Sequence, residues 1–374
     1  MNGNIPVGNI FGIPFYVNPS WFLVLSLVTL SYGSALAAQF PAMGGPLPWL
    51  WGLVAALLLF ASVLAHELGH SFVAISQGIE VRSITLFLFG GLASLERESK
   101  TPGEAFWVAI AGPGVSIILF VLLTAINLTA PFTGPVAAIF GLLAYINLVL
   151  ALFNLIPGLP LDGGNILKAL VWKITGNPYK GVVFASRVGQ ILGWVGIIIG
   201  SLSLLGISNY GSFWTMLIGW FLLQNAGRSA QSAAFADTLA GLKAEDAVTP
   251  NSPIVAANLS LREFANDFVI GNQKWRKFLV IDEWGQLIGS IKVEDMKTIP
   301  TSNWPQTQVK QLTQAIAGST TVRADQSLLE AVQLLEQLQL SQLPVVRDNG
   351  VLVGLLEKAH ISRLLQQKAQ AKPA

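Results

Sequence analysis

Uninterrupted apolar runs fill most of the first 240 residues of this 374-residue chain. Runs of this kind are long enough to cross roughly 30 Å of hydrocarbon as helices, although the last one is short and its ends are indistinct. They lie near residues 21–38, 50–75, 105–128, 136–159, 188–206 and 213–223. The pattern predicts a multi-pass α-helical membrane domain of about six transmembrane helices over residues 1–240.

A different pattern begins near residues 240–243, where short apolar segments alternate with polar ones. Residues 278–289 (FLVIDEWGQLIG) match residues 343–354 (LPVVRDNGVLVG) at an offset of 65 residues. Each copy predicts a strand, a turn, a second strand and a helix, and each follows an amphipathic helix that begins near Ser260 or Ser327. We predict a soluble α+β module of two repeats, over residues 243–300 and 305–370.

The charged residues follow the same division. The chain has 22 basic and 20 acidic side chains, and 27 of these 42 lie in residues 243–374. Only 11% of all residues are charged, whereas about a quarter are charged in an average soluble protein. The net charge of +2 gives no basic surface in bulk, so we expect no nucleic-acid partner. Because the chain has no cysteine, a metal must be held by nitrogen and oxygen ligands.

The basic residues of the membrane domain predict its orientation. The loops after the first, third and fifth predicted spans contain no Lys or Arg. The other loops hold all eight basic residues, which are Arg82, Arg97, Lys100, Lys168, Lys173, Lys180, Arg187 and Arg228. By the positive-inside rule we expect both termini and the soluble module to be cytoplasmic, in a protein of the cell membrane. No basic segment precedes the first apolar run, so we expect no cleaved signal peptide.

The second apolar run contains the sequence His66-Glu67-Leu68-Gly69-His70. Residues four apart share one face of a helix, so the two imidazoles can bind one Zn²⁺ while the glutamate stays free for proton transfer. The alternative is a polar cluster that neighbouring helices satisfy. Ionisable groups in hydrocarbon are costly unless they are paired or functional. The motif therefore predicts a zinc site inside the membrane domain.

A catalytic zinc ion usually has a third protein ligand. Between Glu104 and Asp237 the only acidic residue is Asp162, at the end of the fourth apolar run in NLIPGLPLDGG (residues 154–164). The two prolines of this stretch break a regular helix. His70 and Asp162 are both expected near the cytoplasmic end of their spans, so they can meet. A turn or a helix N-cap is the alternative for Asp162.

Together these residues closely resemble the site-2 protease family of intramembrane zinc metalloproteases. The HExxH motif of the family corresponds to residues 66–70 and its LDG-type motif to residues 161–163, and further landmarks match at residues 12–15, 19–21, 89–91 and 111–113. The resemblance extends from residue 1 to about residue 230. It implies that His66, His70 and Asp162 are zinc ligands. It also implies that Glu67 is the general base and that Asn154 holds substrate or an oxyanion, with an interhelical hydrogen bond as the alternative for Asn154.

The same resemblance implies cleavage within a membrane span, often of a membrane-tethered transcription regulator or an anti-sigma factor. A substrate helix satisfies its own backbone, so it must unwind locally before it can be cut. We therefore expect single-span substrates with Gly, Pro or Asn near the cut. Residues 81–89 predict a strand, and the resemblance suggests that it aligns extended substrate near the active site. A plain loop strand is the alternative.

The two repeats resemble a tandem pair of cystathionine-beta-synthase-type (CBS) domains. Such pairs often bind adenine nucleotides in the cleft between the repeats and regulate an attached enzyme or transporter. The ribose-contacting acid of the family is present as Asp295 in the first repeat but is His360 in the second. For Asp295 a solvated carboxylate at a helix start is the alternative. Purely structural repeats, or repeats that form a homodimer, remain open.

The leading interpretation is an intramembrane zinc endopeptidase with one Zn²⁺ per chain and a cytoplasmic regulatory module. The alternative is a CBS-regulated membrane ion transporter in which the two histidines and Asp162 form the transport site. A transport path normally needs polar groups along its length. Here they are expected at one depth, which favours the protease. A catalytically inactive relative that binds membrane proteins is a third interpretation, but no core residue is missing.

Overall fold

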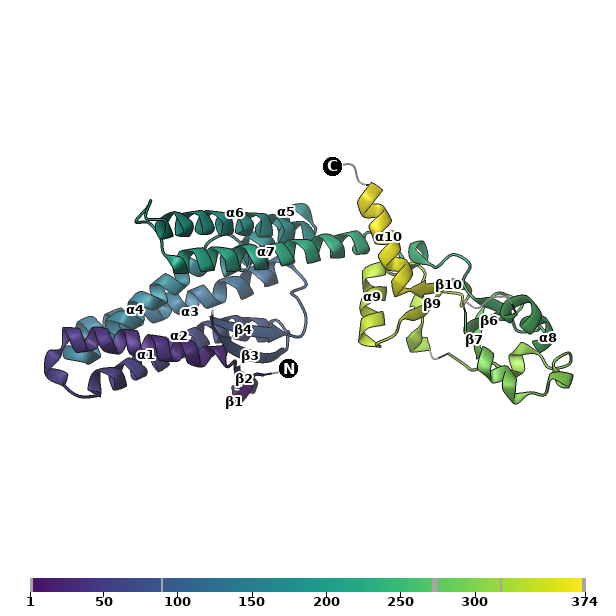
Figure 1. The fold of residues 1–374 in the computed structure, drawn as a ribbon, viewed down its shortest axis with the longest axis horizontal. Coiled ribbons are helices and arrows are strands. Elements are labelled where there is room, and N and C mark those ends of the chain that lie inside the picture. The colour runs from purple at the N-terminus through teal and green to yellow at the C-terminus, as the bar shows by residue number, and fades with distance from the viewer. Residues whose placement is uncertain (1–2, 89, 271–274, 317, 372–374) are drawn as a thin grey trace. The chain divides into compact units, whose positions relative to one another are not determined.

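The chain divides into two compact units, Met1–Ala234 and Phe235–Ala374, in a computed structural model that describes residues 3–88, 90–270, 275–316 and 318–371. The division falls inside the long helix α7 (Phe213–Ala240), and Figure 1 shows the elements of both units. The limits predicted from the sequence, 1–240, 243–300 and 305–370, stay predictions.

Five long apolar helices build the first unit. They are α1 (Ser20–Gln39), α2 (Leu47–Ser76), α3 (Pro102–Thr129), α4 (Gly134–Asn154) and α6 (Pro178–Leu204). Each is long and apolar enough to cross a membrane. The bundle exposes large apolar side chains such as Leu27, Ile118 and Ile191, as expected when the surrounding solvent is lipid. The predicted multi-pass helical membrane domain is confirmed.

Among the described residues, five such helices occur rather than the expected six. The sixth predicted span, residues 213–223, forms the first part of α7, but Gln224, Asn225 and Arg228 follow directly and shorten its apolar stretch. This part of α7 packs closely on α6. A Cβ atom added to Gly200 of α6 would lie 2.7 Å from Cα of Met216.

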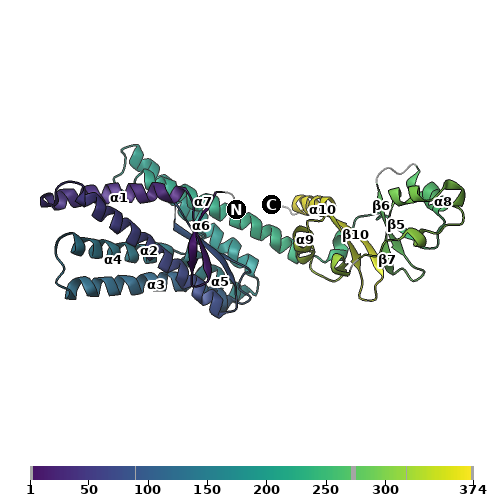
Figure 2. The same cartoon turned by 90° about the horizontal axis from the view of Figure 1, so that it is seen from below.

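A four-stranded sheet lies at the end of the bundle where α1 begins and α2 ends (Figure 2). The strands β1 (Ile5–Ile10) and β2 (Ile13–Val17) precede α1, and β3 (Val81–Phe87) and β4 (Gly90–Leu95) follow α2. The order is β1-β2-β3-β4, with β2 and β3 parallel and the outer pairs antiparallel. Buried Ile13, Ile84 and Leu86 pack in one core with Phe60 of α2. The strand predicted at 81–89 is observed as far as Phe87, and residue 89 lies outside the described residues.

Two hydrogen bonds hold α4 and the turn that follows it in the bundle. Asn147 of α4 is fully buried and donates from Nδ2 to Ser62 Oγ of α2 at 3.1 Å. After α4 the chain turns through residues 155–161, and the amide of Leu159 donates to the carbonyl of Ala185 in α6 at 3.1 Å. The turn leads into the short helix α5 (Asp162–Thr175), which packs on α6 and α3. The packing therefore holds the start of α5 inside the bundle.

The second unit contains two three-stranded sheets of the same topology. The first consists of β5 (Ile254–Ala256), β6 (Lys277–Ile281) and β7 (Leu287–Lys292), and the second of β8 (Val322–Arg323), β9 (Gln342–Val346) and β10 (Leu352–Glu357). In each sheet the first two strands are parallel and the last two antiparallel. This confirms the α+β repeat that the 65-residue offset predicted.

The helices of the two repeats differ in length. In the first repeat α8 (Leu261–Phe264) continues directly as a π-helix over Ala265–Val269, and a 3-10 helix over Val293–Thr298 follows β7. In the second, α9 (Leu328–Gln337) and α10 (Lys358–Ala371) are regular helices. Helix α8 begins with a capping box, in which Ser260 Oγ accepts from the amide of Glu263 at 3.2 Å and the Glu263 carboxylate accepts from the amide of Ser260 at 2.9 Å.

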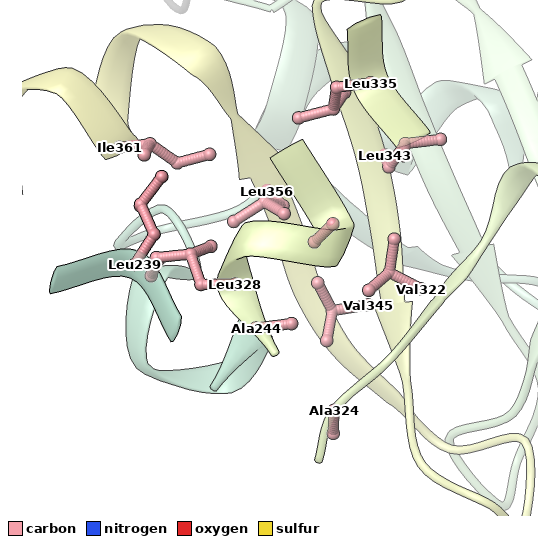
Figure 3. Packing of buried hydrophobic residues seen from close by; sticks show 12 residues of the cluster. Leu239, Ala244, Val322, Ala324, Leu328, Leu335, Leu343, Val345, Leu356 and Ile361 are labelled. Atoms are coloured by element: carbon pink, nitrogen blue, oxygen red, sulfur yellow. The ribbon is translucent and has the colours of Figure 1, made fainter. Parts of the chain in front are cut away.

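Each repeat has a separate hydrophobic core. Figure 3 shows the core of the second repeat, where Leu328 of α9, Leu356 of β10 and Ile361 of α10 point toward one another. Leu239 and Ala244, which precede β5, pack into this same core. The segment then pairs with β10, because the amide of Thr249 donates to Leu355 O at 2.8 Å. Residues that precede β5 thus complete the core of the second repeat.

Candidate metal centre

Two histidines of α2 converge inside the bundle. His66 and His70 are one helical turn apart, and their Nε2 atoms lie 3.3 Å from each other. Only 4% of the His66 side chain and 13% of the His70 side chain are exposed. The two histidines therefore lie on one face of α2, as their spacing of four residues predicted.

Asp162, the first residue of α5, meets both histidines. Its Oδ2 atom lies 3.1 Å from Nε2 of His66 and 3.3 Å from Nε2 of His70. The N-cap of α5 is Leu161, and Asp162 stands inside the first turn, so its carboxylate does not serve as the cap. A Cβ atom added to Gly164 would collide with the backbone of the preceding turn. Because glycine has no Cβ atom, α5 can start this close to that turn. Two distant stretches of sequence are thus joined at one point.

The three donor atoms fit a tetrahedral zinc ion. The two Nε2 atoms and the Oδ2 atom form a triangle with edges of 3.1, 3.3 and 3.3 Å. Ligands at roughly 2.0–2.2 Å from a zinc ion in tetrahedral geometry are about 3.3–3.6 Å apart. Two imidazoles and one carboxylate also leave a fourth position open, as catalytic zinc sites do. The donor types, their number and their spacing suit one Zn²⁺.

Helix α3 orients both imidazoles through their other nitrogen. Nδ1 of His70 lies 2.6 Å from the carbonyl oxygen of Val108, and Nδ1 of His66 lies 2.9 Å from Oγ of Ser116. A carbonyl only accepts, so Nδ1 of His70 donates to it, and Nε2 is the nitrogen left for a metal. Partners of this kind on the outer nitrogen are typical of metal-binding histidines, where they fix the ring and raise its basicity.

Two glycines leave space for the motif side chains. A Cβ atom added to Gly112 of α3 would lie 2.6 Å from Cε1 of His70 and 2.7 Å from Nε2 of His66. A Cβ atom added to Gly91 of β4 would lie 2.8 Å from Cδ of Glu67 and 2.9 Å from its Oε1. Helix α3 therefore approaches the front of both imidazoles, and β4 lies directly against the Glu67 carboxylate. Any larger residue at either position must displace a motif side chain.

Asn154, Asp295 and His360 lie outside the triangle of donor atoms. Asn154 is the half-buried last residue of α4. Asp295 Oδ2 accepts from the amide of Lys292 at 3.0 Å, at the start of the 3-10 helix after β7. This is the position of the helix-start carboxylate that the sequence left open as an alternative. His360 is half-buried in α10.

The sequence did not single out the α3 residues that surround the histidines. Ser116 is an isolated polar residue in an apolar run, and Gly112 lies in the Ala-Gly-Pro landmark at 111–113. Ser116 could have been found from the sequence, because a buried hydroxyl within a membrane span needs a partner. Gly112 could have been found as part of that landmark. Nothing local indicated that the partner would be His66, which is 50 residues earlier.

Comparison with known proteins finds relatives of both parts of the chain. A family model described as peptidase family M50 matches residues 54–133 and 128–196, and a CBS domain model matches residues 310–367. Zinc metalloprotease sll0528 of Synechocystis sp. is 62% identical over 369 residues, which cover 99% of this chain and 97% of that protein. Zinc metalloprotease Rip3 of Mycobacterium tuberculosis is 30% identical over 380 residues, covering 100% and 95%.

A solved structure of a site-2 protease from Methanocaldococcus jannaschii is also similar. It is 29% identical in sequence, covers 61% of this chain and 95% of that chain, and has a TM-score of 0.44. A crystal structure of CBSX2 in complex with AMP covers 34% of this chain and 99% of that chain at 24% identity, with a TM-score of 0.29.

Fold and site together define a metalloprotease of the membrane. Its helices span a bilayer, and the two histidines of its HExxH motif converge with a carboxylate from a later segment. The chain belongs to peptidase family M50, the site-2 protease family, and carries a C-terminal CBS domain pair. The ion transporter considered as an alternative is not favoured, since the relatives that span nearly the whole chain are named zinc metalloproteases.

Proposed function

We propose that this protein hydrolyses a peptide bond within or near the transmembrane segment of a membrane-anchored protein, with His66, His70 and Asp162 as zinc ligands. The observation that carries the proposal is the triangle of donor atoms, whose edges are 3.1–3.3 Å. When bound there, zinc supplies Lewis-acid polarisation of the scissile carbonyl and lowers the pKa of a water molecule. Two of the three donors, His66 and His70, belong to α2, a helix long and apolar enough to cross a membrane, so a protein that spans the same bilayer is the substrate in this proposal.

Glu67 is the general base in this proposal. It takes a proton from the attacking water and returns it to the leaving amine. It stands between the two histidines in sequence but is not one of the three donors. The close packing of Gly91 against its Cδ and Oε1 restricts where the carboxylate can point. Strand β4 is therefore a positioning element for the base.

Asn154 is proposed to hold the substrate carbonyl or the oxyanion. It lies seven residues, about two turns, after Asn147 and so shares its face of α4. Asn147 contacts Ser62 of α2, one turn before His66, and α2 and α4 run in the same direction (Figure 2). Two turns further along, this face of α4 reaches the level of His66 and His70. That placement supports Asn154 as a substrate contact.

The substrate is proposed to bind as an extended strand. Strand β4 is an edge of the sheet, and its Gly91 packs against Glu67. An unwound segment that pairs with this edge would pass the base with its backbone satisfied. Residues 81–87 supply the inner strand that supports β4. We expect faster cleavage of single-span substrates with Gly, Pro or Asn near the cut, and an anti-sigma factor or a tethered transcription regulator fits this class.

The CBS pair is proposed to regulate the protease by binding an adenine nucleotide. A cavity of about 410 Å³ lies between the repeats, lined by Lys277 and Ser290 of the first and by Gln342 and Leu355 of the second. Lys277 is a partner for a phosphate. Asp295 does not line the cavity, so a role in ribose binding requires that it leave the amide of Lys292. Isothermal titration of the full-length protein with AMP tests this, with Lys277→Ala as the variant and loss of binding as the expected result.

The orientation and assembly are part of the same proposal. Both termini and the CBS pair face the cytoplasm of a cell-membrane protein in this proposal, because all eight basic residues of the first 242 positions fall on one side of the spans predicted from the sequence. This arrangement requires α7 to cross the bilayer as a sixth span. The CBS pair is also proposed as the contact of a homodimer. Protease accessibility of the second unit in sealed right-side-out vesicles tests the orientation, and exposure at the outer surface would contradict it.

The central experiment combines zinc content with cleavage. The protein is purified in detergent, its bound zinc is measured, and cleavage of single-span proteins is compared between wild type and Glu67→Gln. We expect one zinc per chain in both and cleavage in wild type only. The matched control is Glu80→Gln, which removes the charge of an exposed glutamate just after α2.

The outcomes separate the roles of the residues. Equal cleavage by wild type and Glu67→Gln rejects Glu67 as the base. Wild-type zinc content in a His66→Ala, His70→Ala double variant rejects the metal site. Loss of cleavage in Glu80→Gln shows that the assay responds to general damage. A substrate stiffened with Ala and Leu at the cut that is cleaved as fast as the original rejects the unwinding requirement.

A further inference from the structure

The hairpin of β1 and β2 exposes apolar side chains and has no charge. Ile5 and Val7 of β1 are 45% and 59% exposed, and Phe11 at the tip is 77% exposed. No Asp, Glu, Lys or Arg occurs before Glu67. Strand β2 faces the core with Ile13, whereas β1 is the outer edge of the sheet. A hairpin surrounded by water normally carries charged side chains on such an edge, whereas the polar side chain of β1 is the uncharged Asn9.

The tip of the hairpin places a phenylalanine in an unfavourable backbone conformation. Phe11 and Gly12 form the two-residue turn, with φ values of 52° and 83°. Turns of this kind favour Asn-Gly, and a bulky side chain in the left-handed region is unfavourable because its Cβ crowds the following carbonyl oxygen. Contacts of the ring with apolar surroundings have to offset this cost.

The position of the tip identifies that environment. The ring of Phe11 meets the ring of Phe72 edge to face, with centroids 5.3 Å apart. Phe72 belongs to the spanning helix α2, four residues or about 6 Å before its last residue. Phe72 and Ile75 are 44% and 46% exposed, so the outward face of α2 remains apolar up to its end. The hairpin tip therefore lies beside an exposed apolar surface at the end of α2.

We propose that the β1–β2 hairpin is a lipid anchor, with Phe11 inserted at the boundary of headgroups and acyl chains where α2 ends. Aromatic side chains favour this zone, and interfacial segments reach roughly 5–10 Å into it. The outer edge of β1 stays at headgroup level, where water satisfies its backbone groups. The occupant of the exposed surface is lipid rather than a second copy of the chain.

The anchor is continuous with the strand that touches Glu67. The sheet order β1-β2-β3-β4 puts the hairpin at one edge and Gly91 at the other. Holding Phe11 at a fixed depth thus fixes how the whole sheet stands relative to the bilayer. The lipid contact itself does not depend on the proposed proteolysis.

The cysteine-free sequence allows a direct test. Phe11→Cys is labelled with a nitroxide in the full-length protein, reconstituted in phosphatidylcholine–phosphatidylglycerol vesicles. Its accessibility to oxygen and to a water-soluble nickel chelate is then measured. The matched control is Trp284→Cys, since Trp284 is also 77% exposed and also precedes a glycine between two paired strands, β6 and β7. Its unit has no membrane-length apolar helix among the residues that the structure describes.

We expect the oxygen-to-nickel accessibility ratio to be about tenfold higher at position 11 than at position 284, as for a label below the headgroups. Equal ratios at both positions would place the tip in water and overturn the proposal. Protection of position 11 from both reagents would indicate a second copy or another protein and would also overturn it. Bound zinc verifies that the labelled protein is folded. If Phe11→Cys fails that check, a lipid-dissolved diazirine on the unmodified chain must label residues 5–17 and not residues 277–292.

Discussion

Gly112→Ala adds one methyl group to α3, and we expect it to disable the metal centre. The new Cβ would lie 2.6 Å from Cε1 of His70 and 2.7 Å from Nε2 of His66, whereas ordinary contacts begin near 3.4 Å. Either the imidazoles or α3 must therefore move by more than about 0.8 Å, because the added Cβ would come closer still to Nε2 of His70. A displacement close to 1 Å costs roughly 100-fold in catalysis. Disturbed ligand orientation typically lowers metal affinity about 10–100-fold.

Helix propensity alone predicts the opposite sign for this substitution. Ala is favoured over Gly in a helix by about 1 kcal/mol, so a glycine without a spatial role would gain stability on substitution. The matched control is Gly114→Ala, two residues later in α3, where an added Cβ meets no atom within 4 Å. Zinc affinity by chelator competition, cleavage rate and thermal unfolding are measured for both variants. Wild-type zinc affinity and cleavage in Gly112→Ala would refute the geometry described for α3 and the two histidines.

Three further predictions test other parts of the structure. Gly91→Val should lower cleavage about 100-fold while leaving bound zinc unchanged, because the added side chain meets Glu67 and not the donors; equal loss of zinc would contradict this. Ser116→Ala should lower zinc affinity roughly 10–100-fold in chelator competition, since Nδ1 of His66 loses its partner, and an unchanged affinity would argue against that hydrogen bond. Hydrogen bonds from the backbone and hydroxyl of its capping serine lower the pKa of Glu263, so this capping box contributes fully above the usual value of 4.5 and is lost as pH falls through the lowered pKa. The unfolding temperature of Glu263→Gln should therefore depend less on pH in this range than that of wild type, and identical profiles would contradict it.

Much of the site was predictable because its features are local in sequence. The HExxH spacing placed both histidines on one helical face, and the scarcity of acidic residues in the membrane domain singled out Asp162. The short apolar run at residues 213–223 was less informative, because it forms only the first part of α7, which packs on α6, and a more polar part of the helix follows. Asp295 shows another limit, because one carboxylate can serve either its own helix or a ligand, and here it binds the amide of Lys292.

The sequence by itself determined which segments cross the membrane, where the soluble repeats lie and which helix carries the two histidines. Hydrophobic period and spacing act within one element, so they need no knowledge of its neighbours. Only the tertiary structure decided that α5 delivers Asp162 to those histidines, that Ser116 and Gly112 of α3 surround them, and that Gly91 of β4 lies against Glu67. These contacts join segments far apart in the chain. They depend on how closely whole helices and strands can approach, which is a property of packing rather than of any local pattern.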